Sequence, residues 1–187
     1  PNLSGKLGHP TELIKNVKYI GPLSRLCKKP MPIKYDLMVL LSGPEPQRTL
    51  LEQKIITELE HYSKKVVFIK GIVEKNQRKE EKGNVTFYNF MNSIEIETTF
   101  NESNHILCRS GYTTVMDLAK LNKKAFFIPT PGQYEQEYLA KKFDKEGIIP
   151  TCKQEKFNIK KLDKIDLYKG FTNYSKKITW KELFDLF

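Results

Sequence analysis

The sequence predicts an α/β fold, a Rossmann-like three-layer α/β/α domain in which a doubly wound parallel sheet lies between two layers of helices. Several short segments are apolar throughout, as in strands that are buried on both faces. Between them lie segments in which apolar residues recur with the spacing of one helix face. Strands that alternate with amphipathic helices in this way are typical of a parallel sheet that is covered on both sides.

The composition supports one globular domain with anionic partners. The chain has 187 residues, of which 39% are hydrophobic, and its apolar runs are far shorter than the ~20 residues of a membrane-spanning helix. Lysine and arginine number 32 against 22 acidic residues, and the net charge of +10 favours phosphorylated small molecules, nucleic acid or an acidic membrane surface as partners. The three cysteines lack metal-ligand or disulfide-framework spacing, and the first residues do not resemble a secretory leader, so we expect a cytoplasmic protein.

Residues 1–34 are expected to be an interdomain linker that contains one short strand. Residues 1–10 are mostly turn formers, and residues 17–20 are the strand candidate. Prolines at positions 22, 30 and 32 predict loop structure for the rest of this segment. Residues 35–187 then form the domain, and the linker-like start leads us to expect an N-terminal domain that this chain lacks.

The first half of the domain is expected to hold three strands and two helices. The charged stretch at residues 74–83 is expected to be a solvated loop. The first helix is identified by Leu51, Ile55, Leu59 and Tyr62, which recur at helical spacing. The strands are residues 36–41, 66–69 and 85–88, and the second helix is residues 94–101.

The second half continues the same alternation. Its strands are residues 105–108, 125–128 and 147–150, and its helices are residues 113–121, 133–143 and 179–187. A domain of this size is expected to leave part of the last helix uncovered, because that helix carries a long apolar stripe. The stripe consists of Trp180, Leu183, Phe184 and Phe187.

The ligand crevice of such a sheet lies beyond the carboxyl ends of its strands, so the loops there carry the functional signal. The loop after the first strand, residues 42–49, has one glycine and two prolines. It therefore matches neither the phosphate loop that ends in Gly-Lys-Ser/Thr nor the Gly-x-Gly-x-x-Gly dinucleotide motif. This mismatch disfavours an ATPase or an NAD enzyme.

The loop after the fourth strand has the pattern of a phosphate site. Ser110 and Gly111 form a small-residue turn before a helix, where free backbone N–H groups meet the positive end of the helix dipole. Gly111 allows backbone conformations that other residues resist, and Thr113 and Thr114 add hydroxyl donors. Asp117 has two possible roles, because it is a candidate ligand and also fits a capping box with Thr114.

The loop after the fifth strand places Glu135 and Gln136 in the first turn of a helix. Carboxylates accept hydrogen bonds from sugar and ribose hydroxyls, and amides both donate and accept. Acidic residues near a helix N-terminus also stabilise the helix by about 0.3–1 kcal/mol each. The residues alone therefore allow either a ligand role or a structural one.

These two loops carry a resemblance to a known family. The chain resembles the C-terminal, nucleotide-sugar-binding half of GT-B glycosyltransferases, and glycosyltransferase family 28 in particular, in the order of its elements over about residues 17–150. The resemblance is specific in two patterns. They are Arg109-Ser110-Gly111-x-Thr113-Thr114-Val115-x-Asp117 and Ile128-Pro129-x-Pro131-Gly132-x-x-Glu135-Gln136-x-x-Leu139-Ala140.

The resemblance implies a part of the donor for each site residue. By position, the diphosphate would meet Ser42, Gly43, Ser110, Gly111, Thr113 and Thr114, the ribose Asp117, the base the backbone at Phe90 and Met91, and the sugar Glu135 and Gln136. No catalytic residue is expected in this chain, because the family's base and acceptor site lie in the N-terminal domain. The fragment alone is therefore expected to be inactive.

The implied function is inverting, metal-independent transfer of a hexosyl group from a nucleoside-diphosphate sugar, with a UDP-sugar as the first choice. The sequence contains no Asp-x-Asp metal motif, so the helix that begins near Thr113 would stabilise the leaving diphosphate, with neither a metal nor another cofactor. Three features depart from the family's peptidoglycan-synthesis enzyme. These are a first loop with fewer glycines, Asp117 in place of glutamate, and Glu137 in place of a second glutamine.

The expected partners are the nucleotide-sugar, the N-terminal acceptor domain of the full-length protein, and an anionic membrane surface or lipid-linked acceptor at the inner face of the membrane. Two alternatives remain. One is a sugar-nucleotide epimerase or hydrolase of the same fold. The other is a non-catalytic basic module that binds a membrane partner or nucleic acid, although aromatic residues are not interleaved with Lys and Arg in any one segment, so nucleic acid is not expected.

Overall fold

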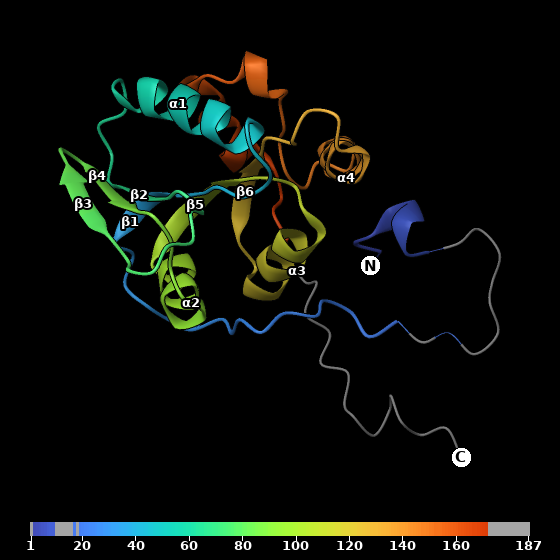
Figure 1. The fold of residues 1–187 in the computed structure, drawn as a ribbon. Helices are drawn as coiled ribbons and strands as arrows, with labels where there is room; N and C mark the ends of the chain where they lie inside the picture. Colours follow the sequence, from blue (N-terminus) through green and yellow to red (C-terminus); the bar gives the residue numbers. More distant parts are fainter. Residues whose placement is uncertain (1, 10–16, 18, 172–187) are drawn as a thin grey trace.

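The structure, a computed structural model, describes residues 2–9, 17 and 19–171, and its centre is a six-stranded sheet (Figure 1). The strand order is β3-β4-β2-β1-β5-β6, and all neighbouring strands are parallel except β3 and β4. The strands are β1 (Tyr35–Leu40), β2 (Val66–Ile69), β3 (Lys79–Lys82), β4 (Val85–Tyr88), β5 (Ser103–Cys108) and β6 (Lys124–Phe127). The predicted doubly wound α/β fold is confirmed.

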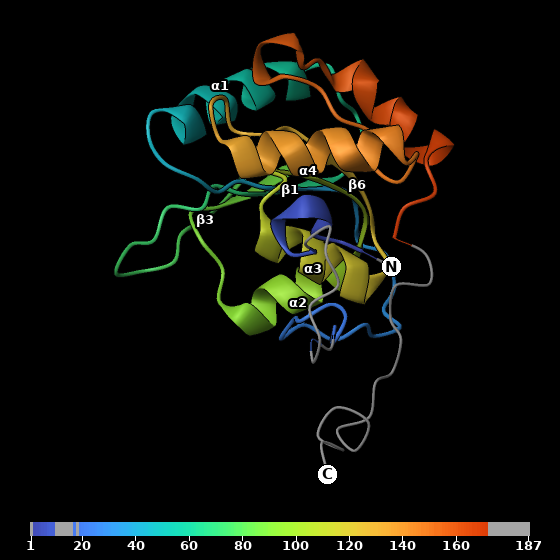
Figure 2. The same cartoon turned by 90° about the vertical axis from the view of Figure 1, so that its right-hand side faces the viewer.

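Helices cover both faces of the sheet (Figures 1 and 2). They are α1 (Gln47–Leu59), α2 (Ser93–Asn101), α3 (Tyr112–Leu121) and α4 (Tyr134–Lys145), with 3-10 segments η1 (Gly5–Leu7), η2 (Gln154–Lys156) and η3 (Ile159–Leu167). Met38 of β1 lies in the core with α2, α3 and α4, whereas Leu37 and Val39 lie in the core with α1 and η3. Because successive residues of the strand enter opposite cores, residues 37–40 of β1 form an unbroken apolar run.

The predicted strands at residues 66–69 and 85–88 coincide with β2 and β4. The short strand expected at residues 17–20 is not found, because Val17, Tyr19 and Ile20, its described residues, have irregular structure. The helix expected at residues 179–187 lies outside the described residues. Among the residues that are described, no helix has both the length and the apolar content needed to cross a bilayer.

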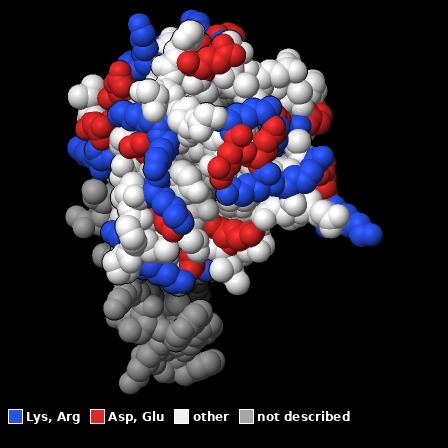
Figure 3. All heavy atoms as spheres, turned by 90° about the vertical axis from the view of Figure 1, so that its left-hand side faces the viewer, with Lys and Arg blue, Asp and Glu red and all other residues white. Residues whose placement is uncertain are grey.

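Strand β3 corrects the prediction of a solvated loop at residues 74–83. All four of its side chains are exposed, and they pair along the strand, Lys79 with Glu81 and Lys82 with Glu80. Figure 3 shows this side of the molecule, where basic and acidic side chains lie interleaved. The strand forms because its backbone pairs with β4, and an edge strand without an apolar face leaves no alternating pattern in the sequence.

The strand expected at residues 147–150 is also wrong, because these residues, all of them described, form the turn that follows helix α4, which ends at Lys145. Ile148 N–H and Ile149 N–H donate to the carbonyl of Phe143. Both isoleucines are buried, which explains their apolar character, but their N–H groups are used by the helix end. Pairing with β6 is limited to one bridge between Phe127 and Thr151.

The described part of residues 1–34 contacts the domain around Leu3, around Leu26 and at Lys34, although this segment was expected to be a linker. Near the N-terminus, Leu3 is buried and the backbone N–H of Lys6 donates to the hydroxyl of Tyr138 on α4 at 2.8 Å (Figure 2). Further along, Leu26 is 2% exposed and belongs to the core that α2 and α3 share. The second contact brings the segment beside helix α3, at the edge of the sheet that holds the candidate site.

Candidate functional site

The candidate site lies where the chain stops adding strands on one side of β1 and begins to add them on the other side. Strand β1 pairs with β2 on one side and with β5 on the other. The helices that follow leave toward opposite faces, because α1 packs in one core and α3 in the other. In a doubly wound sheet the ligand crevice lies at such a point, beyond the carboxyl ends of β1 and β5, and we take this place as the candidate site.

The β1 side of the crevice is formed by the loop that carries Ser42 and Gly43. Both residues are exposed, and Gly43 has a φ of 105°, a conformation that favours glycine. A Cβ atom on Gly43 would lie 3.5 Å from Thr130 Oγ1 in the loop after β6. The structure therefore places Ser42 and Gly43 after the carboxyl end of β1, close to the loop after β6, and their contact with a diphosphate stays a prediction.

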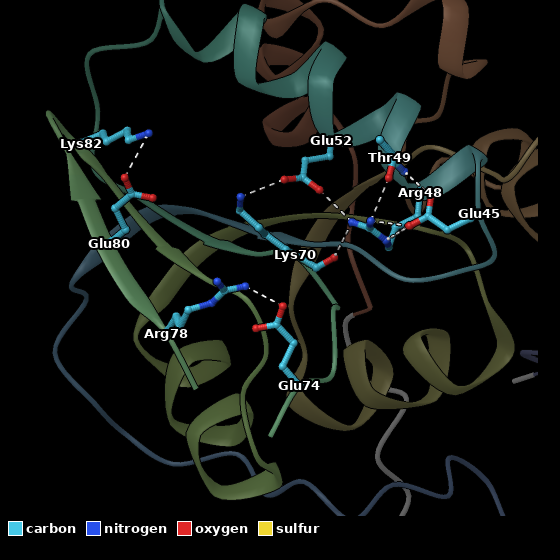
Figure 4. Close-up of polar contacts among 9 residues, drawn as sticks. All are labelled: Glu45, Arg48, Thr49, Glu52, Lys70, Glu74, Arg78, Glu80 and Lys82. Carbon is cyan, nitrogen blue, oxygen red and sulfur yellow. Dashed lines mark hydrogen bonds and ion pairs between the residues drawn. The ribbon is translucent and has the colours of Figure 1, made fainter. Parts of the chain in front are cut away.

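Arg48 pairs with two glutamates beside this loop (Figure 4). Its guanidinium bonds to Glu45 and, at 2.7 Å, to Oε2 of Glu52 on α1. Nη1 also donates to the backbone carbonyl of Lys70 at 3.2 Å, and the Lys70 ammonium pairs with Glu52 at 3.0 Å. These contacts give Arg48 a structural role.

Arg109 ties three loops together in the floor of the crevice. It is 1% exposed, and Nη1 donates to the carbonyls of Ile128 and Pro129, each at 3.1 Å. Nη2 donates to the carbonyl of Gln47 at 2.9 Å. Burial lowers the pKa of Arg109 to about 10, so the guanidinium stays protonated at neutral pH. This arginine is also structural, and it fixes the loop that leads into α3.

The first turn of α3 faces the crevice with its N–H groups. The N-cap is Gly111, with a φ of −68°, so the conformational freedom that the sequence suggested for this glycine is not used. The space beside Gly111 is open, because within the described chain a Cβ atom at this position would meet no atom within 4 Å. Thr113 is exposed and Thr114 half-buried in this turn, next to the N–H groups that lack intrahelical partners.

Ser110 is turned away from the crevice. Its side chain is buried, and its hydroxyl donates to the backbone carbonyl of Gln136 at 2.7 Å. A hydroxyl has one proton, so this bond leaves none for a phosphate. The side chain of Ser110 therefore joins α4 to the loop before α3. A contact between Ser110 and a diphosphate would have to use the backbone of this residue, and that contact stays a prediction.

Asp117 does not form the capping box that the sequence allowed. Helix α3 begins at Tyr112, so Thr114 lies inside its first turn and Asp117 in the next. The carboxylate Oδ1 accepts a hydrogen bond from the hydroxyl of Ser24 at 2.6 Å. Burial raises the pKa of Asp117, and the bond from Ser24 and the charge of Arg25 oppose that shift.

Sequence reasoning missed Ser24, because a serine in a proline-rich segment has no local pattern that predicts a partner on a distant helix. Asp117 and this serine lie at an open hollow of about 530 Å³ beside the first turn of α3. The hollow is lined by Leu23, Ser24, Arg25, Thr113 and Asp117. The segment before β1 thus contributes one side of the candidate site.

Glu135 and Gln136, predicted as a pair, point in different directions. Glu135 reaches across from α4, and its Oε1 accepts from the backbone N–H of Tyr112 at the start of α3 at 3.3 Å. Gln136 is 8% exposed and bonds within its own loop, to the N–H of Thr130 at 2.9 Å and to Gln133 at 2.7 Å. Glu135 therefore lies at the start of α3 and Gln136 does not, and the sugar contacts of both residues stay predictions.

The loop after β4 lies at the same edge of the sheet as the loops after β1 and β5, because these strands are parallel. Met91 is half-buried against the core, and its Sδ accepts from the hydroxyl of Thr99 at 3.4 Å. The backbone carbonyl of Phe90 accepts from the side chain of Gln77 at 3.0 Å. Gln77 lies in the stretch that the sequence described only as charged, and it was not predicted at the site. Across the described ranges, no three His, Cys, Asp or Glu side chains are grouped so that they could hold a metal ion.

Comparison with known proteins identifies a family. Residues 46–179 match the family model described as the glycosyltransferase family 28 C-terminal domain. A comparison with curated proteins finds no match. The matched range contains the loops after β4, β5 and β6, and therefore most of the candidate site.

Solved structures with a similar fold include three proteins. MurG from Acinetobacter baumannii has a TM-score of 0.51 and 18% identity, over 76% of this chain and 44% of MurG. The glycotransferase of kitacinnamycin has a TM-score of 0.52 and 13% identity, over 79% of this chain and 39% of that protein. The solution structure of ALG13 has a TM-score of 0.54 and 16% identity, over 76% of this chain and 92% of ALG13. At these identities the similarity concerns the fold, and the chain spans less than half the length of the first two proteins.

Proposed function

The chain belongs to the glycosyltransferase family 28 C-terminal domain family, and from this premise we propose that it is the donor-binding domain of an inverting glycosyltransferase. The donor is a nucleoside-diphosphate sugar, with UDP as the first candidate nucleotide, and binding needs no metal. The transferred group is a hexose. The acceptor and the base that activates it belong to an N-terminal domain of the full-length protein, so this chain alone transfers nothing.

The observation that carries the proposal is the first turn of α3. It starts at the crevice between β1 and β5, its N-cap is a glycine, and the space beside that glycine is open. Helix N-termini of this kind bind phosphate through backbone N–H groups and the helix dipole. Support from the neighbouring loops comes from Ser42 and Gly43 on one side and Glu135 on the other.

The same turn accounts for the chemistry. When the acceptor hydroxyl attacks the anomeric carbon, the bond to the diphosphate breaks and negative charge grows on the leaving oxygens. N–H groups that already point at those oxygens stabilise the transition state more than the ground state, because the charge is larger there. In this proposal Asp117 accepts the ribose hydroxyls, and the loop at Phe90 and Met91 meets the base.

We further propose a cytoplasmic location beside an anionic membrane face, where a lipid-linked acceptor would be reached. The excess of basic over acidic residues, 32 against 22, supports attraction to such a surface. On the side shown in Figure 3, however, basic and acidic side chains are mixed. That mixture gives no support to a nucleic-acid function on this face, since nucleic-acid sites use a continuous basic surface.

A nucleotide panel tests the proposal. The chain is titrated by calorimetry and melted in the presence of UDP, GDP, dTDP, a UDP-sugar, AMP and an oligonucleotide, each with Mg²⁺ and with EDTA. At about 100 times its dissociation constant, UDP should raise the unfolding free energy by about 2.7 kcal/mol, equally with and without the metal. Binding of the oligonucleotide in place of any nucleoside diphosphate would refute the proposal, and so would binding of UDP only with Mg²⁺.

A further inference from the structure

We propose that Ser24 is a positioning residue of the nucleotide site, whose hydroxyl orients the Asp117 carboxylate toward the ribose. The inference rests on the proposed function, because it takes Asp117 as the ribose ligand. Its basis is the hydrogen bond of 2.6 Å between Ser24 Oγ and Asp117 Oδ1, which joins residues 93 positions apart. On this inference the segment before β1 is part of the donor site.

The segment that carries Ser24 is held in place without the help of Asp117. Leu26, two residues on, is 2% exposed in the core. The backbone N–H of Cys27 donates to Oε2 of Glu97 at 2.7 Å, and the backbone N–H of Lys29 donates to Oδ1 of Asn101 at 3.0 Å. The Asn101 amide returns a bond to the carbonyl of Cys27, also at 3.0 Å. Residues 26–29 are therefore fixed to helix α2.

The direction of the Ser24 hydrogen bond follows from its neighbours. Ser24 Oγ accepts from the backbone N–H of Leu26 at 3.0 Å, so that N–H occupies one of its lone pairs. An ionised carboxylate only accepts, so the single hydroxyl proton goes to Asp117. Because Leu26 is anchored in the core, the hydroxyl has a fixed place from which it holds the carboxylate.

Holding one carboxylate oxygen orients the other. With Oδ1 bonded to Ser24, the plane of the carboxyl group is set, and we assign Oδ2 to the ribose hydroxyls. The side chain is half-buried at the open hollow that Leu23, Ser24 and Arg25 line together with α3. A ligand that enters this hollow meets a carboxylate that is already oriented, and pre-orientation of this kind lowers the entropic cost of binding.

The test compares Ser24→Ala with the parent chain in calorimetric titrations of UDP, 2′,3′-dideoxyuridine diphosphate and pyrophosphate. We expect Ser24→Ala to weaken UDP binding about fivefold, the factor that corresponds to a hydrogen bond of about 1 kcal/mol. Binding of the dideoxy analogue and of pyrophosphate should not change, since neither has ribose hydroxyls for Asp117. Ser24→Thr, which keeps the hydroxyl, should restore UDP binding.

Thr57→Ala is the matched control. Thr57 also donates a side-chain hydrogen bond, to the carbonyl of Gln53 at 3.2 Å, but it is exposed on α1 at the other face of the sheet. It should leave the affinity for all three ligands unchanged. Urea melts of each variant show whether the fold is intact.

The outcomes separate this inference from the proposed function. If the parent chain binds UDP and Ser24→Ala binds it equally well, the positioning role is wrong while the donor-binding function stands. If Ser24→Ala weakens UDP and the dideoxy analogue by the same factor, the serine supports the fold and not the ribose contact. If the parent chain binds no nucleoside diphosphate, the proposed function fails, and the inference fails with it.

Discussion

Helices α2 and α3 start at the same edge of the sheet, but their first turns are completed in different ways. At α2, Asn92 Oδ1 accepts from Ile94 N–H at 2.9 Å and Glu95 N–H at 3.0 Å, and Oε2 of Glu95 accepts from Asn92 N–H at 2.7 Å. This capping box satisfies the helix with its own residues. At α3 the corresponding position is Gly111, which has no side chain to offer.

This difference shows how the N–H groups at the start of a helix can stay available for an anion. Residues within α2 supply its acceptors, so an outside phosphate would find its N–H groups occupied. At α3 the acceptor comes from another helix, since Glu135 of α4 reaches Tyr112 N–H over a long 3.3 Å bond. A phosphate that carries more charge than a carboxylate can displace such a bond. The four predictions below test this contrast, from the largest expected effect to the smallest.

The approach to α3 should depend on Arg109 more than on any other side chain in the crevice floor. Arg109→Met leaves the carbonyls of Gln47, Ile128 and Pro129 without their donor, and we expect the unfolding free energy to fall by about 3–5 kcal/mol. Urea denaturation measures the loss. The control is Arg78→Met, since Arg78 is largely exposed and pairs with Glu74 at the surface, and it should cost less than about 1 kcal/mol. Equal losses in the two variants would contradict the structural role of Arg109.

Asp117→Asn should weaken UDP binding by about 1.5–3 kcal/mol, the contribution of a hydrogen bond to a charged group, with little change in the unfolding free energy. The capping box that the sequence allowed would give the reverse result, a less stable domain with unchanged affinity. Calorimetric titration with UDP, together with urea melts of the same sample, decides between them.

The pH dependence of UDP binding is a second test of the role of Asp117. Burial raises the pKa of Asp117, so its carboxylate protonates at a higher pH than that of an ordinary aspartate. UDP binding should therefore weaken as the pH falls through this raised pKa, while the contribution of Asp117 to stability rises, because the folded state binds the proton more tightly than the unfolded state. The Asp117→Asn variant should lose this pH dependence of affinity, and a parallel decline in both proteins would assign the titration to another group.

Gly111→Asp gives α3 the kind of cap that α2 has, and it should remove the contrast between the two helices. The added carboxylate would occupy the N-terminus of the helix and repel a diphosphate, so we expect UDP affinity to fall by about 1–2 kcal/mol. Stability should rise by about 0.3–1 kcal/mol, since an acidic residue suits a helix N-terminus and the surrounding space is open. Gly111→Ser, which caps without charge, should show a smaller loss of affinity. UDP binding that is unchanged in Gly111→Asp would place the diphosphate elsewhere.

Asn92→Ala is the converse experiment, because it removes the cap of α2 where Gly111→Asp adds one to α3. Loss of the capping box should lower the unfolding free energy by about 1 kcal/mol and leave UDP affinity as it was, because the acceptors of this turn are internal to the helix. A urea melt and one UDP titration are enough to measure both quantities. An Asn92→Ala variant that bound UDP more weakly would show that α2 also takes part in the donor site.

Much of the fold follows from local pattern. Strands β2 and β4 were predicted to the residue. The four side chains of β2 are buried on both faces and leave an unbroken apolar run, whereas β4 alternates buried with half-buried residues, all of types that favour strands. Strand β3 was missed for the opposite reason, since all its side chains are exposed and its backbone pairing with β4 is not encoded in its own residues. The prediction at residues 147–150 was wrong because the burial of Ile148 and Ile149 alone does not distinguish a strand from a buried turn after a helix.

The sequence by itself determined the class of the domain, the loops that meet at the crevice, and the family to which their residues belong. Only the tertiary structure decided which side chains remain free there. Arg109 and Ser110 lie in the recognised pattern, yet the fold uses the first for three carbonyls, of Gln47, Ile128 and Pro129, and the second for the carbonyl of Gln136. Asp117 gained a partner 93 residues away. The local pattern of apolar residues indicates most helices and buried strands, whereas the hydrogen-bond partner of a side chain depends on segments that only the folded chain brings together.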